Sequence, residues 1–166
     1  MRRDSIGSLV LLAVLALLIL RPWERAAIDE PAAVTAPVTR VVDGDTFEAR
    51  IGGEAEDVRL IGIDTPETVK PDTPVQCWGP QASDFTHNLL EGRTVRLVFG
   101  VERRDVYGRL LAYVHLGDRF VNATLVRRGL ARTLTIPPND RYAPVLRRLE
   151  IGAARAGRGL WGACGP

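Results

Sequence analysis

The chain has 166 residues, of which 46% are hydrophobic and 25% are charged. These values exclude a disordered or collagen-like chain and favour one globular domain, while a net charge of +2 does not by itself indicate a nucleic-acid-binding protein. The charge is unevenly divided, because residues 38–92 hold 4 basic and 11 acidic side chains whereas residues 93–166 hold 14 basic and 5 acidic ones. The first part of this region is therefore acidic and the second part basic, which the net charge of the whole chain does not reveal.

Residues 1–23 predict an export signal. Two arginines follow the initiator methionine, and an almost wholly apolar run extends from Ser5 to Leu20. The run is compatible with a cleaved signal peptide or with an uncleaved signal-anchor helix that starts in the cytoplasm. We favour the anchor, because no small-residue cleavage site follows the run directly. Residues 24–37 are rich in Ala and Pro and predict an extended linker.

Residues 38–166 predict the folded domain, which begins as a β-meander. Short runs of β-branched and apolar residues are separated by Gly- and Asp-rich turns, which is typical of strands joined by tight connections. Five strands are expected, over Val38–Val42, Thr46–Ile51, about Glu56–Ile63, Thr94–Val101 and Leu110–Leu116.

Three helices are expected between and after these strands: one that begins at Pro80 and ends near Gly92, one over Ala123–Arg128 and one over about Pro144–Ala156. Pro80 suits a first helical position, Asn122 would cap the second helix, and a glycine follows the second and the third. Five short strands with interposed helices favour an α+β, mainly β, fold built on a five-stranded closed barrel of the OB type. The hydrophobic N-terminal helix would precede this barrel.

Residues able to do chemistry concentrate around the third expected strand. Asp45, Asp64 and Glu67, with nearby carbonyl oxygens, would form a hard oxygen site that suits Ca²⁺ or Mg²⁺ rather than Zn²⁺. Arg59 and Arg109 add guanidinium groups that match phosphate oxygens, so the set would suit phosphodiester hydrolysis. Alternation along an extended strand would put Arg59 and Asp64 on opposite faces. Taken alone, an Asp-Gly-Asp sequence is more often only a turn.

Five motifs follow one another in the domain. They are Asp43-Gly-Asp-Thr46, Arg59-Leu-Ile-Gly-Ile-Asp-Thr-Pro-Glu67, Gly79-Pro-Gln-Ala82, Asp105-Val-Tyr-Gly-Arg-Leu-Leu-Ala-Tyr113 and Val121-Asn-Ala-Thr-Leu-Val-Arg-Arg-Gly-Leu-Ala131. In this order they resemble the staphylococcal nuclease (thermonuclease) family, from about residue 38 to residue 161. The resemblance implies an OB-fold barrel with three helices, and a Ca²⁺-dependent nuclease that cuts DNA and RNA.

The resemblance also implies roles for the acidic residues. The family's calcium ligands fall on Asp45 and Asp64, with the backbone carbonyl of Thr65 as a third, and Ca²⁺ is expected in preference to Mg²⁺. Asp43 would lie behind these ligands. The family's general base falls on Glu67, which would orient or deprotonate the attacking water.

By the same resemblance, Arg59 and Arg109 would hold the phosphate and stabilise its developing charge. Thr135 and Pro137 stand where the family has aromatic side chains that pack on the terminal nucleotide, so we expect weaker substrate binding with the chemistry intact. Other arginines would either compensate for this loss or only keep the surface soluble. They are Arg103, Arg104, Arg127, Arg128, Arg132, Arg147 and Arg148.

Two cysteines are too few for a disulfide scaffold and lack the spacing of a zinc site. In an exported domain, a disulfide between Cys77 and Cys164 is expected over two free thiols. His87 and His115 stand near no other reactive group in the sequence, so we expect surface or half-buried side chains rather than catalytic ones.

The favoured hypothesis is a monomeric metal-dependent endonuclease that acts on DNA or RNA. It would be exported, and either anchored in the membrane facing the exterior or envelope, or secreted after cleavage. The alternative is a non-catalytic OB-fold module that binds nucleic acid or a protein partner. A third hypothesis, an anchored calcium-binding structural domain, explains Asp45 and Asp64 but gives Arg59 and Arg109 no role.

Overall fold

The computed structural model describes residues 32–69 and 72–164. The hydrophobic segment and most of the linker, expected over residues 1–23 and 24–37, lie outside the described residues. Within the described ranges, none of the helices is both long enough and apolar enough to cross a membrane.

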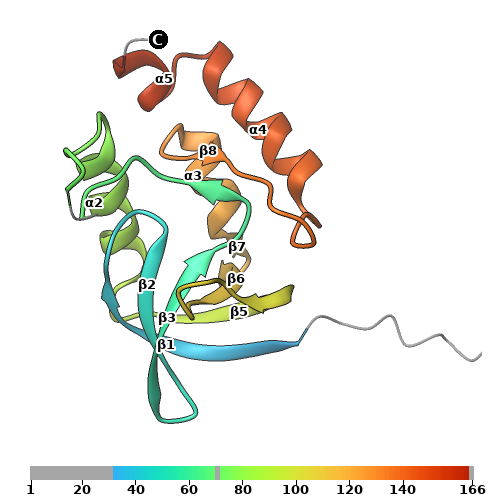
Figure 1. Cartoon of the computed structure of the whole chain (residues 1–166). Helices are drawn as coiled ribbons and strands as arrows, with labels where there is room; N and C mark the ends of the chain where they lie inside the picture. Colours follow the sequence, from blue (N-terminus) through green and yellow to red (C-terminus); the bar gives the residue numbers. More distant parts are fainter. Residues whose placement is uncertain (1–31, 70–71, 165–166) are drawn as a thin grey trace, which may run out of the picture. The chain divides into compact units, whose positions relative to one another are not determined.

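Five strands close into a barrel (Figure 1). They are β1 (Ala33–Val41), β2 (Thr46–Ile51), β3 (Glu54–Leu60), β5 (Thr94–Arg104) and β6 (Leu110–Leu116). The order is β3-β2-β1-β5-β6 with antiparallel neighbours, and a parallel pairing of β3 with β6 closes the sheet. The number and the order along the chain of the expected strands are confirmed, and the closed barrel with its helices is the expected OB-type fold.

The first strand begins five residues earlier than the sequence suggested. Residues 33–37, expected to end the linker, pair with β5 from Ala33 opposite Val98 to Pro37 opposite Thr94. Ala36 in this stretch is completely buried. The barrel therefore starts at Ala33 rather than at Val38, because small apolar residues that resemble a linker also fit a buried strand face.

The third strand ends earlier than expected, and this changes the site. β3 stops at Leu60, and the chain turns at Gly62, whose φ of 79° lies in the left-handed region, before the short strand β4 (Ile63–Asp64). A Cβ on Gly62 would come within 2.7 Å of the Leu146 side chain, so the position is also sterically closed. The expected separation of Arg59 and Asp64 on opposite faces is wrong, because the turn brings them back together.

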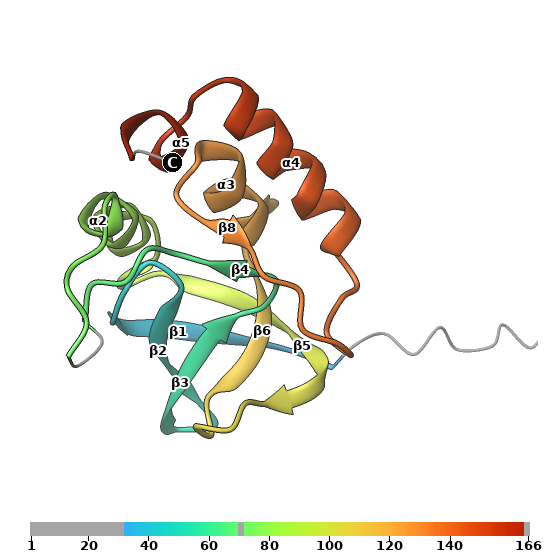
Figure 2. The same cartoon turned by 45° about the horizontal axis from the view of Figure 1, so that its top comes forward.

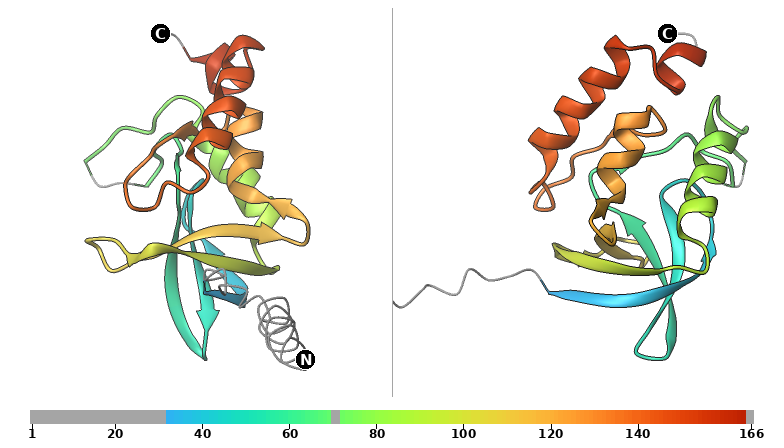
Figure 3. Two further views of the ribbon diagram at one scale, coloured as in Figure 1. Left: turned by 90° about the vertical axis from the view of Figure 1, so that its right-hand side faces the viewer. Right: turned by 180° about the vertical axis from the view of Figure 1, so that it is seen from behind.

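The remaining elements form a layer at one end of the barrel (Figures 2 and 3). They are α2 (Gly79–Leu90), α3 (Val121–Arg128), β8 (Arg132–Thr133), α4 (Ala143–Arg155) and α5 (Leu160–Ala163), whereas β7 (Arg119–Phe120) extends the barrel sheet by pairing with β6. β8 pairs with β4 in a separate two-stranded sheet. Gly129, at a φ of 71°, ends α3 as expected. The views agree that α3 lies between α2 and α4.

Asn122 does not cap α3, because the helix already begins at Val121. Its side chain is completely buried, accepts a hydrogen bond from the Val114 N–H at 2.9 Å and donates one to the Ile61 carbonyl at 2.8 Å. Asn122 therefore joins β6 to the turn after β3, and so helps to fix the segment that carries the acidic residues.

One hydrophobic core joins the barrel to the helices. Phe47, Leu60 and Leu97 of the barrel, with Leu125 of α3 and Leu146 of α4, are each at most 1% exposed. Burial of such a side chain contributes about 1.5–3 kcal/mol. The helix layer is therefore held on the barrel by the same core, with β4 at the junction.

Candidate active site

The loop between β1 and β2 presents the first acidic residues. Backbone N–H groups of Val42 and Asp43 bond to the Thr46 carbonyl at 2.9 and 3.1 Å, and Asp43 Oδ1 accepts a bond from the Asp45 N–H at 3.0 Å. From α2, the Thr86 hydroxyl donates to the Gly44 carbonyl at 2.7 Å. The Asp-Gly-Asp sequence is thus a turn, as its composition favours, and α2 holds it in place.

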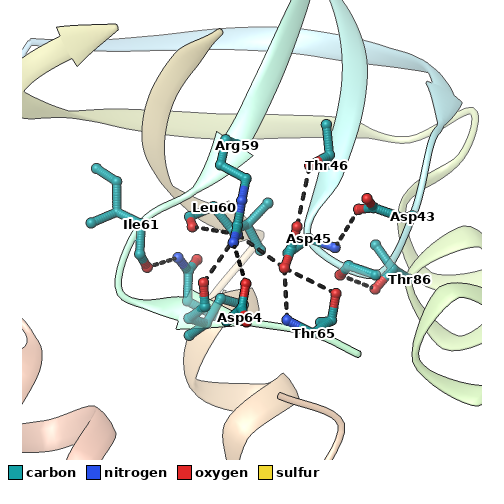
Figure 4. Close-up of polar contacts among 12 residues, drawn as sticks. Asp43, Asp45, Thr46, Arg59, Leu60, Ile61, Asp64, Thr65 and Thr86 are labelled. Atoms are coloured by element: carbon teal, nitrogen blue, oxygen red, sulfur yellow. Dashed lines mark hydrogen bonds and ion pairs between the residues drawn. The ribbon is translucent and has the colours of Figure 1, made fainter. Parts of the chain in front are cut away.

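Asp45 and Asp64 are joined by one guanidinium group (Figure 4). Arg59 Nη1 lies 3.0 Å from Asp45 Oδ2, and Nη2 lies 2.9 Å from Asp64 Oδ1. Arg59 Nη1 also donates to the Ile63 carbonyl at 3.0 Å, which spans the turn after β3. The same Asp45 oxygen accepts bonds from the Thr65 N–H at 2.7 Å and the Thr65 hydroxyl at 2.9 Å. We call Asp43, Asp45, Arg59 and Asp64 the acid cluster.

Negative charge is in excess in this cluster. Burial and the neighbouring charge of Asp45 raise the pKa of Asp43 from 3.8 to about 6. Partial burial raises the pKa of Asp64. The positive charge of Arg59 lowers this pKa, whereas the negative charges of Asp45 and Glu67 raise it, and the net shift is upward. Both shifts favour protonation, and a bound cation would relieve the same repulsion.

Glu67 lies in the segment directly after the cluster. Its Oε1 accepts bonds from the Thr68 and Val69 N–H groups at 2.9 and 3.0 Å. Its backbone exchanges two bonds with Gln76, because the Glu67 N–H donates to Gln76 Oε1 and the Gln76 N–H donates to the Glu67 carbonyl, both at 2.9 Å. The adjacent Cys77 is joined to Cys164 by a disulfide, the state that the sequence favoured. Sequence reasoning did not identify the role of Gln76.

Arg109 reaches the same region from the loop between β5 and β6. Asp105 Oδ2 accepts from both Arg109 Nε and Nη2 at 2.8 Å, and the Arg109 guanidinium lies 5.4 Å from the centre of the Tyr107 ring. Arg59 and Arg109 line one cavity of about 310 Å³. The structure therefore brings together two arginines that are 50 positions apart in the sequence.

Part of the wall of this cavity is aliphatic. Leu134 and Ile136 line the cavity, whereas Thr135 and Pro137, the positions singled out in the sequence, do not. Tyr107, which is 82% exposed, supplies an aromatic ring that sequence reasoning did not consider. The cavity thus combines two arginines and the acidic residues Glu102 and Asp105 with apolar side chains, a mixture that suits a ligand with a polar and an apolar part.

The described residues do not form a ready metal site. No three His, Cys, Asp or Glu side chains in residues 32–69 and 72–164 are arranged to hold one ion together. Arg59 bridges the two carboxylates that were predicted as ligands. Neither histidine lines the cavity. His87 pairs with Glu91 at 3.1 Å, and the His115 ring stacks on the Phe120 ring.

Comparisons with known proteins give a consistent result. Residues 57–163 match the family model described as staphylococcal nuclease homologue. The chain is 41% identical to a thermonuclease of Staphylococcus intermedius and 36% identical to a thermonuclease of Staphylococcus hyicus, in both cases over 97% of this chain and 99% of the relative. Endonuclease YncB of Bacillus subtilis (strain 168) is 37% identical over 80% of this chain and 64% of its own length.

Proposed function

The chain belongs to the staphylococcal nuclease family, and on this premise we propose that it is a calcium-dependent endonuclease that hydrolyses phosphodiester bonds of both DNA and RNA. The observation that carries the proposal is the cavity lined by Arg59 and Arg109, with Asp45 and Asp64 held on the same Arg59 guanidinium. Cations that bind phosphate therefore adjoin carboxylates that bind a metal ion.

The residues of the acid cluster fit a hard divalent cation. Asp45 and Asp64 supply carboxylate oxygens, Thr65 follows with its backbone carbonyl, and this donor set suits Ca²⁺ better than a softer metal. The raised pKa values of Asp43 and Asp64 support this fit, because carboxylates with too little positive charge around them gain most from a bound cation. When bound, the cation supplies a positive charge at the phosphoryl oxygen and lowers the pKa of a coordinated water.

Phosphate binding, proton transfer from water and charge stabilisation would depend on Arg59, Glu67 and Arg109. Arg59 and Arg109 would bind the phosphate through the N–H groups of their guanidinium side chains. Glu67 accepts a proton from the attacking water, whose oxygen bonds to phosphorus as the bond to the leaving oxygen breaks. Both guanidinium groups stabilise the charge that develops on the phosphoryl oxygens.

Location and assembly are also proposals. We propose an exported monomer, either anchored through residues 1–23 or secreted after cleavage. The apolar run from Ser5 to Leu20 supports export, and the disulfide between Cys77 and Cys164 is typical of an oxidising compartment.

Assays on the full chain test the proposal. Single-stranded DNA and RNA are incubated with the protein in Ca²⁺, in Mg²⁺ or in EGTA, and cleavage is followed for the wild type, Glu67→Gln and Arg59→Ala. We expect cleavage in Ca²⁺ alone, and a loss of about 10²–10⁴-fold in each variant. Glu56→Gln is the matched control, because Glu56 pairs with Arg104 outside the cavity and its loss should leave the rate unchanged.

A second candidate function is the non-catalytic OB-fold module. The preformed contacts of Arg59 with both carboxylates favour it, because they already occupy oxygens of Asp45 and Asp64 in the absence of a metal ion. A wild type that binds nucleic acid and cuts neither substrate with either metal would support this candidate and contradict the endonuclease.

A further inference from the structure

The exposed arginines of the basic C-terminal half have different partners. Several are engaged locally, since Arg104 bonds to Glu56 at 2.7 and 2.9 Å and Arg147 bonds to Glu150 at 2.6 Å. Arg132 lies over the Trp161 ring at 4.3 Å. These side chains have stabilising contacts within the fold, which is the role expected of a soluble arginine-rich surface.

Arg127, Arg128 and Arg158 are arranged differently. They line one groove of about 600 Å³ between α2, the end of α3 and the turn before α5, together with Trp78 and Phe85. Figure 2 shows α2 and α5 on the same side of α3. All three arginines are exposed, and among residues 32–69 and 72–164 no acidic side chain pairs with them or lines the groove.

Two of these arginines are held in place by the fold. The Arg128 guanidinium lies 4.7 Å from the centre of the Phe85 ring, so its flat face is covered while its N–H edge stays available. Arg158 Nη1 donates to the Arg127 carbonyl at 3.2 Å, which ties the turn before α5 to the end of α3. A positive groove whose side chains are already ordered binds an anion with a smaller entropic cost.

The groove adjoins the segment that carries Glu67 but is separate from the cavity of Arg59 and Arg109. The two share no lining residue. Trp78 of the groove is followed by Gly79, where a Cβ would come within 2.8 Å of the Thr68 side chain and 3.0 Å of the Glu67 carbonyl. The groove therefore borders the segment that carries Glu67, and a strand cut there would need to extend only past this segment to reach it.

We infer that this groove is a second binding site for single-stranded nucleic acid, in which Arg127, Arg128 and Arg158 contact phosphates of the substrate strand away from the bond that is cut. The inference rests on the proposed nuclease function, since the strand is the substrate. Phosphates match the three guanidinium groups, and the partly buried ring of Trp78 lines the groove beside them and offers an apolar surface for a base. Such a site would offset the aliphatic wall of the catalytic cavity.

Binding measurements on the full chain test the inference without relying on cleavage. Anisotropy of a labelled 20-nucleotide single-stranded DNA is measured in EGTA for the wild type and for Arg127→Gln/Arg128→Gln/Arg158→Gln. The matched control is Arg96→Gln/Arg119→Gln/Arg155→Gln, which removes three exposed arginines elsewhere. For single strands, the logarithm of the binding constant falls with the logarithm of the salt concentration by about 0.7 for each phosphate contact. Loss of three contacts should therefore make this slope shallower by about 2 in the groove variant, which should also bind at least about tenfold more weakly.

Strand length and a single substitution sharpen the test. The difference from the control should disappear for a four-nucleotide strand, which is too short to occupy both sites. Arg127→Gln alone should lose about 0.7 units of slope, and it serves if the triple variant fails to fold.

The outcomes separate this inference from the proposed activity. Equal affinity and slope in the groove and control variants overturn the inference even if the wild type cuts DNA. Groove-dependent binding by a wild type that cuts nothing supports the site and contradicts the nuclease. If polyglutamate competes with the strand at equal charge and with the same groove dependence, the groove is an acidic-protein site and the inference is wrong.

Discussion

Glu150 connects the helix layer to the strand behind the acid cluster. Its side chain, on α4, is 5% exposed, and its carboxylate accepts from the Thr133 N–H at 2.9 Å, the Thr133 hydroxyl at 2.7 Å and Arg147 Nη1 at 2.6 Å. Thr133 lies opposite Ile63 in the β4–β8 pair, and the next residue of β4 is Asp64. We therefore expect Glu150→Gln to destabilise the protein through this connection.

The magnitude follows from these partners. A hydrogen bond to a charged group contributes about 1.5–3 kcal/mol. In Glu150→Gln, an amide NH2 group replaces one carboxylate oxygen and faces a hydrogen-bond donor instead of accepting from it. The substitution should therefore cost about 3 kcal/mol. Arg147 is 68% exposed, and an exposed ion pair contributes at most about 1 kcal/mol. Arg147→Gln should therefore cost less than about 1 kcal/mol.

The effect should depend on pH in a defined direction. Burial alone would raise the pKa of Glu150, but the hydrogen bonds from Thr133 and the interaction with Arg147 outweigh burial and lower it. A folded pKa below the unfolded value contributes stability above the ordinary carboxyl pKa, and this stability is lost as the pH falls through the folded pKa. The cost of Glu150→Gln should therefore be largest near neutral pH and shrink in acid.

Urea unfolding of the wild type and both variants at pH 7 and in acid measures these differences. The slope with urea should stay constant, so that a change in midpoint reports stability. The reasoning is refuted if Glu150→Gln and Arg147→Gln cost the same at pH 7, or if the cost of Glu150→Gln is unchanged in acid.

Three further predictions concern other parts of the fold. Burial and Asp45 raise the pKa of Asp43 to about 6, so the free energy of unfolding in EGTA should fall as the pH rises from about 4 to about 6. Asp43→Asn should remove this fall and stabilise the protein at pH 7 by roughly 1–2 kcal/mol. A wild-type free energy of unfolding that does not change over this pH range contradicts the prediction. Asn122→Ala leaves two buried backbone groups without their partner and should cost about 2–4 kcal/mol in urea unfolding, whereas a loss below about 1 kcal/mol opposes this account. Replacing Cys77 and Cys164 by Ser opens a loop of 87 residues and should lower stability by up to about 4–5 kcal/mol, which calorimetry under non-reducing conditions measures; equal melting temperatures would refute it.

Local patterns predicted most of the fold but not its exceptions. The five barrel strands and three main helices follow from apolar periodicity and from glycine and proline signals. Ala33–Pro37 was interpreted as linker, because pairing with β5 depends on a partner about 60 positions away and leaves no local pattern. The end of β3 was missed because Ile61 and Ile63 extend the apolar run across Gly62, which turns the chain next to the Leu146 side chain of α4.

The candidate site residues stay predictions that rest on their motifs, and the contacts among them had no signal in the sequence. Alternation placed Arg59 and Asp64 on opposite faces, and only the turn at Gly62 brings them into contact. Asn122 has the composition of a helix cap, and its burial between β6 and the turn depends on the closed barrel. Gln76 lies in a polar loop, where no sequence pattern predicts a bond to the backbone of Glu67.

The distribution of charge around the two arginines supports the proposal that one site binds both a cation and a phosphate. Arg109 has its own carboxylate, Asp105, and this pair is balanced. Arg59 alone faces three carboxylates, and the raised pKa values of Asp43 and Asp64 express the remaining excess of negative charge. A further fixed arginine beside them would reduce this excess and with it the gain from binding a metal ion. Under the proposed function, the uncompensated negative charge would favour a metal ion, and Arg59 would be available to bind the phosphate.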